Sequence, residues 1–201
     1  MTPADPGHLA SFLADPLAAH TVLLEPAPRP LVKNWTLAEV LQVVTDFDRQ
    51  PDYARGREMF AAASCYQCHR IGNAGSTVGP DLTGVGRRFS VADLAAAIVE
   101  PNKTISDQYQ QQVFEAGGRV YVGRVTNLWD DKIAINTNIL DPKSTVQLRV
   151  DELDDQCPSD VSMMPSGLLD TLSAEDIVDL FAFLRSGGDP AHAIYGSREG
   201  N

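Results

Sequence analysis

Four stretches of the chain place apolar residues at helical spacing directly after a residue that can cap a helix. A helix N-terminus leaves backbone N–H groups without partners, and a short polar side chain just before it can accept from them. The capping residues are Thr36, Asp52, Ser90 and Ser173, and an acidic residue stands three positions after the first and the last two: Glu39, Asp93 and Asp176. We therefore predict helices that begin at residue 37, run from 53 to about 63, cover 91–99 and cover 174–185, with Gly187 ending the last.

The spacing of apolar residues changes to every second position between about residues 107 and 150. Such alternation predicts strands with one buried face. Ala116-Gly117-Gly118 predicts a hairpin turn, and residues 129–131 and 140–143 predict loops. The alternating apolar positions are Val120, Val122, Ile133, Ile135, Val146, Leu148 and Val150. This part of the chain is expected to form a small antiparallel sheet.

The remaining segments read as connections. Residues 72–87 are too rich in glycine for a helix and predict a loop. Residues 1–34 are rich in proline and alanine and predict a linker or N-terminal extension, and 189–201 predict a flexible tail. We therefore expect one domain over 35–188, mainly α, with a β-sheet insertion at about 107–150 that makes it α+β overall.

Composition and charge narrow the classes of function. The chain has 201 residues, 43% of them hydrophobic, which is enough for a buried core. The formal net charge of −11 argues against nucleic acid and anionic membranes as partners and favours a protein with a basic docking face. No apolar run reaches the length of a membrane span, so no membrane span is expected in this chain.

The chemistry concentrates in the motif Cys65-Tyr66-Gln67-Cys68-His69. Two thiols three positions apart, followed at once by a histidine, have the spacing of c-type haem attachment. Each thiol can form a thioether with one haem vinyl group while the imidazole reaches the iron. The motif thus predicts one covalently attached haem c, with Cys65 and Cys68 holding the ring and His69 the iron.

Other readings of a Cys-x-x-Cys pair need features that this sequence lacks. A thioredoxin-like redox motif needs a parallel strand–motif–helix context, and a zinc site needs a second pair of ligands. The remaining cysteine is Cys157, and the other histidines are scattered singly at His8, His20 and His192. Cys157 is expected to be a half-buried free thiol.

Residues on both sides of the motif extend the pattern. Gly56-x-x-x-Phe60 precedes it, and Gly79-Pro80-x-Leu82-x-Gly84 followed by Gly86-Arg87 comes after it. In this order the motifs resemble the class I cytochrome c family. The resemblance implies that the Pro80 carbonyl accepts a hydrogen bond from His69, that Leu82 packs on the haem and that Arg87 meets a propionate. Arg88 competes for that last role, while Leu82 as ordinary core and Arg87 as a solvated charge are the plainer alternatives. The family pattern also implies that the last helix, through Phe183, crosses the first haem helix at Gly56 and Phe60.

A second iron ligand is offered by Met163-Met164-Pro165. In the family, the distal methionine commonly stands immediately before a proline in a loop ahead of the last helix. The resemblance therefore favours Met164 over Met163 as the ligand. Core packing is the alternative for either methionine, because this side chain fills gaps readily.

The inserted sheet departs from a minimal cytochrome c. Over about residues 50–188 the pattern looks like the haem-binding domain typical of planctomycete multidomain proteins, which often follows a propeller-type sugar dehydrogenase. The resemblance implies a fused dehydrogenase domain or a redox partner protein as the electron source. Haem is attached to such motifs outside the cytoplasm, yet residues 1–5 lack the regions of a signal peptide. We therefore expect a periplasmic or otherwise exported protein of which this chain is a fragment.

The predicted function is single-electron transfer by a monohaem c-type cytochrome domain that is not itself an enzyme. His69 and Met164 would make the iron six-coordinate and closed to other ligands, and methionine ligation raises the reduction potential. The main alternative is an open-site haem protein, either a peroxidase-like enzyme or a gas or redox sensor, in which neither methionine binds. A purely structural haem module is a third possibility, which redox cycling with a partner would separate from an electron carrier.

Overall fold

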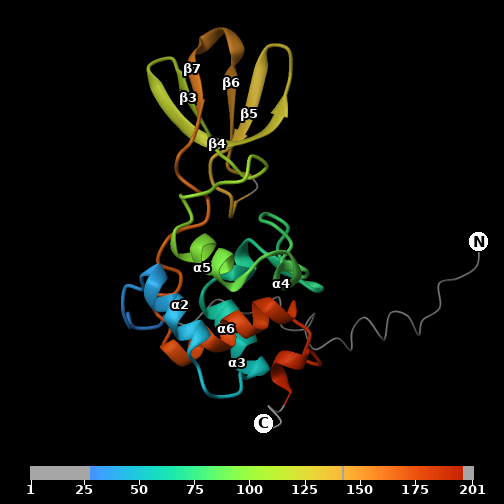
Figure 1. The fold of residues 1–201 in the computed structure, drawn as a ribbon. Coiled ribbons are helices and arrows are strands. Elements are labelled where there is room, and N and C mark those ends of the chain that lie inside the picture. Colours follow the sequence, from blue (N-terminus) through green and yellow to red (C-terminus); the bar gives the residue numbers. More distant parts are fainter. Residues whose placement is uncertain (1–27, 142, 197–201) are drawn as a thin grey trace, which may run out of the picture. The chain divides into compact units, whose positions relative to one another are not determined.

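A computed structural model of the protein describes residues 28–141 and 143–196. The chain divides into two units, the first made of Met1–Ala95 with Gly167–Asn201 and the second of Ala96–Ser166. Figure 1 labels the helices and strands of both. Most of the predicted linker over 1–34 and the end of the predicted tail over 189–201 lie outside the described residues.

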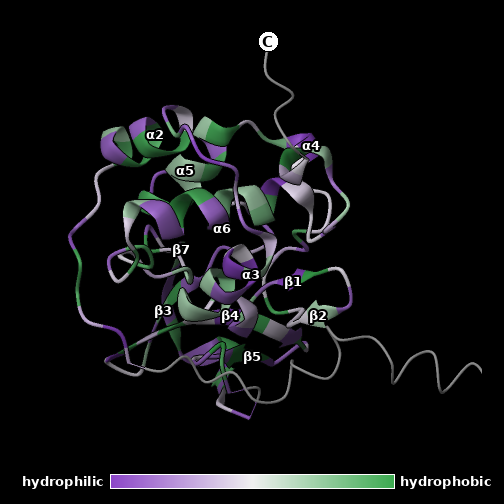
Figure 2. Cartoon of the chain, turned by 90° about the horizontal axis from the view of Figure 1, so that it is seen from below, coloured by the Kyte–Doolittle hydropathy of each residue, from purple (hydrophilic) through white to green (hydrophobic). Residues whose placement is uncertain are grey.

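The predicted helices are present, with bounds within a few residues of those expected. They are α2 (Leu37–Thr45), α3 (Tyr53–Ala62), α5 (Val91–Val99) and α6 (Ala174–Ser186). The side chains of Thr36 and Ser173 cap α2 and α6, and the acidic residue three positions on returns a hydrogen bond in each case. In Figure 2, the ribbon of α2 alternates hydrophilic and hydrophobic residues, as its spacing predicted.

Helix α6 is the centre of the first unit, with ten of its thirteen residues buried. Helix α3 crosses it so closely that a Cβ atom at Gly56 would lie 2.2 Å from the carbonyl oxygen of Asp179. Next to this crossing, the rings of Phe60 and Phe183 pack with centroids 5.5 Å apart. The predicted crossing at Gly56 and Phe60 is therefore confirmed.

Two buried carboxylates on α6 are paired with arginines from other segments. Asp176 accepts from Arg29 at 2.6 Å and from Arg55 at 2.7 Å. Asp179 accepts from Arg49 at 2.8 Å. Burying a charge costs much less free energy when the charge is paired and hydrogen-bonded. These ion pairs therefore explain how the two carboxylates can be buried in the core.

The segment after the haem motif contains more regular structure than the predicted loop. Strands β1 (Arg70–Ile71) and β2 (Ala74–Gly75) pair, and a short helix α4 (Val85–Arg88) follows. The prediction that 72–87 form only a loop is therefore wrong. Val85 is buried and α4 packs against α6, so tertiary contact outweighs the low helical preference of the glycines.

The second unit is a five-stranded antiparallel sheet in the order β6-β5-β4-β3-β7. The strands are β3 (Gln112–Ala116), β4 (Arg119–Leu128), β5 (Lys132–Asn136), β6 (Thr145–Arg149) and β7 (Leu153–Pro158), and a 3-10 turn, η3 (Val150–Glu152), joins the last two. The first half of β4 pairs with β3 and its second half with β5, with an irregularity between Val125 and Asn127. The sheet core consists of Phe114, Ala116, Ile133, Ile135 and Leu148.

This sheet overturns the prediction of a mainly α fold. Five paired strands and the helices of the first unit make the described chain α+β. The strand that the pattern did not predict, β7, has the sequence Leu-Asp-Asp-Gln-Cys-Pro and exposes nearly every side chain. An edge strand of this kind lacks apolar alternation, and its pairing with β3 is decided by the backbone.

Two further observations concern the described residues as a whole. Cys157 lies on β7 and is exposed, so the expectation of a half-buried thiol is wrong. Across residues 28–141 and 143–196, no helix is both long enough and apolar enough to cross a membrane.

Candidate haem site

Helix α3 delivers the Cys-x-x-Cys-His motif. The Asp52 side chain caps the start of the helix by accepting from the Arg55 N–H at 2.9 Å. At its end, Ser64 takes a left-handed conformation with φ of 60°, which is uncommon for a residue other than glycine. This residue turns the chain out of the helix and into the 3-10 turn η2 (Cys65–Gln67). The strained backbone therefore stands directly before the first thiol.

Both thiols lie in this one turn. The carbonyl of Cys65 accepts from the N–H of Cys68 at 3.2 Å and from the N–H of His69 at 2.8 Å. Burial raises the pKa of the Cys65 thiol to about 12 and also raises that of Cys68. In the protein without a cofactor, both sulfurs are therefore protonated thiols at neutral pH and not thiolates.

The imidazole of His69 is hydrogen-bonded through Nδ1 to the loop that follows the motif. Its Nδ1 lies 2.9 Å from the carbonyl oxygen of Pro80. Since a carbonyl only accepts, Nδ1 carries the proton and Nε2 keeps its lone pair. Burial lowers the pKa of His69, partly opposed by this hydrogen bond, so the ring stays neutral at neutral pH. The ring is therefore oriented as a metal-binding histidine needs to be.

Gly79 allows the loop to lie against the ring. A Cβ atom at this position would be 3.0 Å from Cε1 and 3.1 Å from Nδ1 of His69. The Gly79 N–H also donates to the carbonyl of Cys68 at 2.6 Å. A side chain here would press on the imidazole and weaken its hydrogen bond to Pro80.

An ion pair and backbone contacts hold this loop against the motif. The Arg70 guanidinium binds the Asp81 carboxylate, and the Leu82 N–H donates to the Arg70 carbonyl at 2.8 Å. The hydrogen bond from Thr83 and the Arg70 contact lower the pKa of Asp81 well below its usual range. The side chain of Leu82, expected to pack on the haem, is half-buried in this loop.

The two neighbouring arginines of α4 differ in what they bind. Arg88 donates to the carbonyl oxygens of Asp81 at 3.0 Å and Gly84 at 3.4 Å. Arg87 is exposed, and its side chain has no hydrogen bond or ion pair within the part of the chain that the structure describes. Of the two, Arg87 is therefore the one whose guanidinium is available to an anionic group.

The candidate second ligand belongs to the other unit. Met163 and Met164 lie half-buried in the segment after β7, before the chain returns to the first unit at Gly167. The Met164 N–H donates to the Ser162 hydroxyl at 3.1 Å, and the Ser162 N–H donates to the Asn102 side chain at 2.8 Å. Iron binding by Met164 stays a prediction.

The residues of the first unit fit a covalently held haem. Two thiols in one turn can each add to a vinyl group, and the adjacent imidazole presents Nε2 because Nδ1 is bound to Pro80. By contrast, a zinc site would need further ligands, and within the described ranges no group of three or more Cys, His, Asp or Glu side chains is arranged so that it could hold a metal ion.

Comparison with known proteins agrees with this chemistry. The family model of cytochrome c matches residues 53–135, which include α3, the motif and the loop that contacts His69. The match supports a cytochrome c family, and with it haem-based electron transfer and covalently bound haem c. Among curated proteins, no relative matched the chain.

Sequence reasoning did not identify three features of the site. These are the left-handed Ser64, the contact of Gly79 with the ring and the ion pair between Arg70 and Asp81. A signal for the ion pair was available, because Arg70 directly follows His69 and Asp81 directly follows Pro80. The hydrogen bond between His69 and Pro80 brings their neighbours together as well.

Proposed function

We propose that this chain is a monohaem c-type cytochrome domain that transfers single electrons. The observation that carries the proposal is the turn at 65–69, in which two thiols are followed directly by an imidazole that the Pro80 carbonyl orients. Haem bound there would supply an iron that alternates between ferrous and ferric states. The protein's part is to hold that iron, set its potential and control its access, so no substrate bond is made or broken.

His69 and Met164 are proposed as the two residues that would bind the haem iron. The bond from Nδ1 to Pro80 supports the first, because it fixes the ring plane and raises the basicity of Nε2. The second rests on the thioether chemistry of Met164 and on its place immediately before Pro165. A thioether ligand favours ferrous iron and raises the reduction potential.

Pro80, Leu82 and Arg87 are proposed to shape the surroundings of the ring. Pro80 would act through its carbonyl, Leu82 by covering the ring with an apolar side chain, and Arg87 by meeting a propionate. Arg87 forms no ion pair in the described ranges, whereas the guanidinium of Arg88 is bound to backbone carbonyls. This difference supports Arg87 over Arg88 as the residue that would meet a propionate.

The electron donor is proposed to be a dehydrogenase, either fused to this chain or separate, with a basic docking face. The net charge of −11 supports a basic partner, since opposite charges speed diffusional encounter. Cytochrome c domains are typically exported, and we propose the same location for this protein. Docking by opposite charges should slow as salt is added.

Covalent attachment is tested by acid–acetone extraction followed by intact mass. The proposal expects the mass of the protein to include the haem after extraction. In Cys65→Ser or Cys68→Ser the haem should be attached through one thioether only, and when both cysteines are replaced the haem should be extracted. Cys157→Ser is the matched control, because this third cysteine is exposed on β7 and should leave haem attachment unchanged. Haem that leaves with the solvent, with a bare-chain mass remaining, would contradict the proposal.

Iron binding by Met164 is tested by spectroscopy. The oxidised protein should show the weak near-infrared sulfur-to-iron charge-transfer band, and the reduced protein should bind carbon monoxide poorly. Met164→Ala should abolish the band, open the iron to carbon monoxide and lower the reduction potential. Met163→Ala is the matched control and should leave the spectrum nearly unchanged.

The two methionine variants separate three outcomes. If the band survives in Met164→Ala and vanishes in Met163→Ala, the ligand is Met163 and electron transfer remains the function. If the unmutated protein lacks the band and binds carbon monoxide readily, the iron has an open position. An enzyme or sensor would then replace the electron carrier.

A further inference from the structure

Three large apolar side chains are exposed at one end of the five-stranded sheet. Leu128 is 66% exposed, Trp129 47% and Val150 43%. Leu128 and Trp129 lie at the turn between β4 and β5, and Val150 begins η3. We call residues 128–132 and 149–155 the loop-end surface.

Hydrogen bonds join the two segments of this surface. The Trp129 N–H donates to the Lys132 carbonyl at 2.8 Å, which closes the turn around Asp130 and Asp131. The Val150 N–H donates to the Asp131 carbonyl at 2.9 Å, which attaches η3 to that turn. The apolar side chains therefore stand on one structured surface and not on separate loops.

The exposed side chains of the loop-end surface do not pack into the core of the sheet. Ile133 and Leu148, paired with each other on β5 and β6, are buried next to the turn, while Leu128 and Val150 stay exposed. An exposed tryptophan beside other apolar groups is typical of the anchors of protein interfaces, where tryptophan is enriched.

The surface is strongly acidic. Its twelve residues contain six carboxylates, from Asp130, Asp131, Asp151, Glu152, Asp154 and Asp155, against two cations, Lys132 and Arg149, a net charge of −4. Arg149 is engaged by Asp151, at 2.7 and 2.9 Å. Within residues 28–141 and 143–196, Asp130 and Asp131 take part in no ion pair, and both side chains are exposed. Asp131 is among the carboxylates that raise the pKa of Arg149, so Asp130 and Asp131 together still leave negative charge on the surface.

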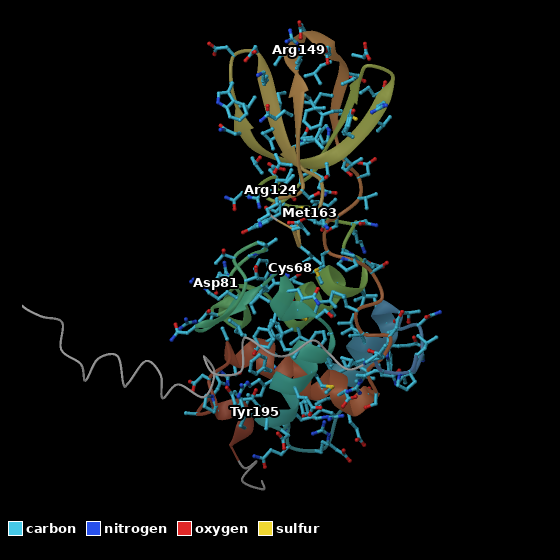
Figure 3. The ribbon with its side chains drawn as sticks, turned by 180° about the vertical axis from the view of Figure 1, so that it is seen from behind. Cys68, Asp81, Arg124, Arg149, Met163 and Tyr195 are labelled. Carbon is cyan, nitrogen blue, oxygen red and sulfur yellow. The ribbon has the colours of Figure 1, made fainter. Side chains whose placement is uncertain are left out.

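The chain enters and leaves the sheet at its other end. Gln112 and Pro158 are paired there, and the Ser159 N–H donates to the Gln111 carbonyl at 2.9 Å. Figure 3 shows Arg149 at the loop end of the sheet, with Arg124 and Met163 at the opposite end. The segments that connect the sheet to the rest of the chain therefore do not occupy the loop-end surface.

We propose that the loop-end surface binds an extended segment of a protein partner that carries arginine or lysine together with apolar residues. The apolar residues pack on Leu128 and Val150, a cation stacks on the indole of Trp129, and Asp130 and Asp131 pair with further cations. A second copy of this chain is disfavoured as the occupant, because its own loop-end surface has the same negative charge. This inference does not depend on the haem chemistry.

The test uses the haem-loaded full chain and a phage-displayed library of short random peptides. Panning should enrich peptides with several arginine or lysine residues. Synthetic versions of these peptides should lose about tenfold or more in affinity for Trp129→Ala, as expected for an interface anchor. Asp130→Asn combined with Asp131→Asn should weaken binding at low salt and make it less dependent on salt.

Matched controls come from the same unit. Leu128→Ala should weaken the peptides, while Leu140→Ala, which removes a leucine of similar exposure (56%) from the β5–β6 loop, should not. Far-UV circular dichroism should be unchanged in each variant, since the altered side chains are exposed. Enrichment of neutral or acidic peptides, no enrichment at all, or equal binding by Trp129→Ala would overturn the proposal. So would a dimer in sedimentation that Trp129→Ala dissociates, because the occupant would then be a second copy.

Discussion

Replacing Gly56 with alanine tests the helix crossing on which the first unit depends. The added Cβ would lie 2.2 Å from the carbonyl oxygen of Asp179 and 2.9 Å from the Cβ of Phe183. The nearest atom belongs to backbone inside a buried helix, so no side-chain rotation can relieve the contact. Helices α3 and α6 would have to separate by about 1 Å to restore an ordinary van der Waals distance.

The expected magnitude follows from two opposing effects. Alanine in place of glycine favours a helix interior by about 1 kcal/mol. Overpacking a close contact costs about 1–3 kcal/mol, and the upper end applies here because two backbones must move apart. We therefore expect Gly56→Ala to lower the free energy of unfolding by about 2 kcal/mol, opposite in sign to the effect of helix propensity alone.

Urea unfolding of the haem-loaded protein, followed by far-UV circular dichroism, measures this difference. Gly84→Ala is the matched control, because a Cβ there would come no closer than 3.9 Å to its neighbours, the side chain of Arg88. That variant should stay within about 0.5 kcal/mol of the original protein. If Gly56→Ala were as stable as the original protein or more stable, the close crossing would be refuted.

Two further predictions concern the buried charge and the histidine. For Asp176, burial raises the pKa, but hydrogen bonds from the Ser173 N–H and Arg55 and the charges of Arg55 and Arg29 outweigh burial, so the net pKa is lowered. The ionised carboxylate therefore stabilises the folded state at pH values above its unfolded-state pKa. This stabilisation is lost as the pH falls through the folded-state pKa. Asp176→Asn should therefore lower the free energy of unfolding by about 2 kcal/mol at neutral pH, which is below the usual range for a buried pair because the arginines are partly exposed. Urea unfolding at a series of pH values should show this difference shrinking below about pH 4. A difference independent of pH would contradict the prediction. Gly79→Ala should weaken the bond between His69 and Pro80, make Nε2 less basic and shift the reduction potential upward in spectroelectrochemistry, with Gly84→Ala as the unchanged control; an unaltered potential would show that the ring does not feel this contact.

The amino-acid sequence was sufficient to predict the parts of the molecule whose causes are local. The capping residues and apolar spacing predicted the helices at 37–45, 53–62, 91–99 and 174–186 to within a few residues, because capping acts within one turn. The spacing of Cys65, Cys68 and His69 pointed to haem for the same reason, since one turn of chain suffices to hold all three. The glycines at 117 and 118 likewise predicted the β3–β4 hairpin turn.

Tertiary structure decided the features whose partners lie far apart in the sequence. Strand β7 exists because β3, about forty residues earlier, offers its free backbone groups, and nothing in the acidic sequence of β7 predicts a strand. Helix α4 forms in a glycine-rich segment because Val85 is buried against α6. The five-stranded sheet, in which β7 is an edge strand, is what makes the fold α+β and not mainly α. Local pattern reports only the preferences of neighbouring residues, whereas an edge strand or a short packed helix is stabilised by distant ones.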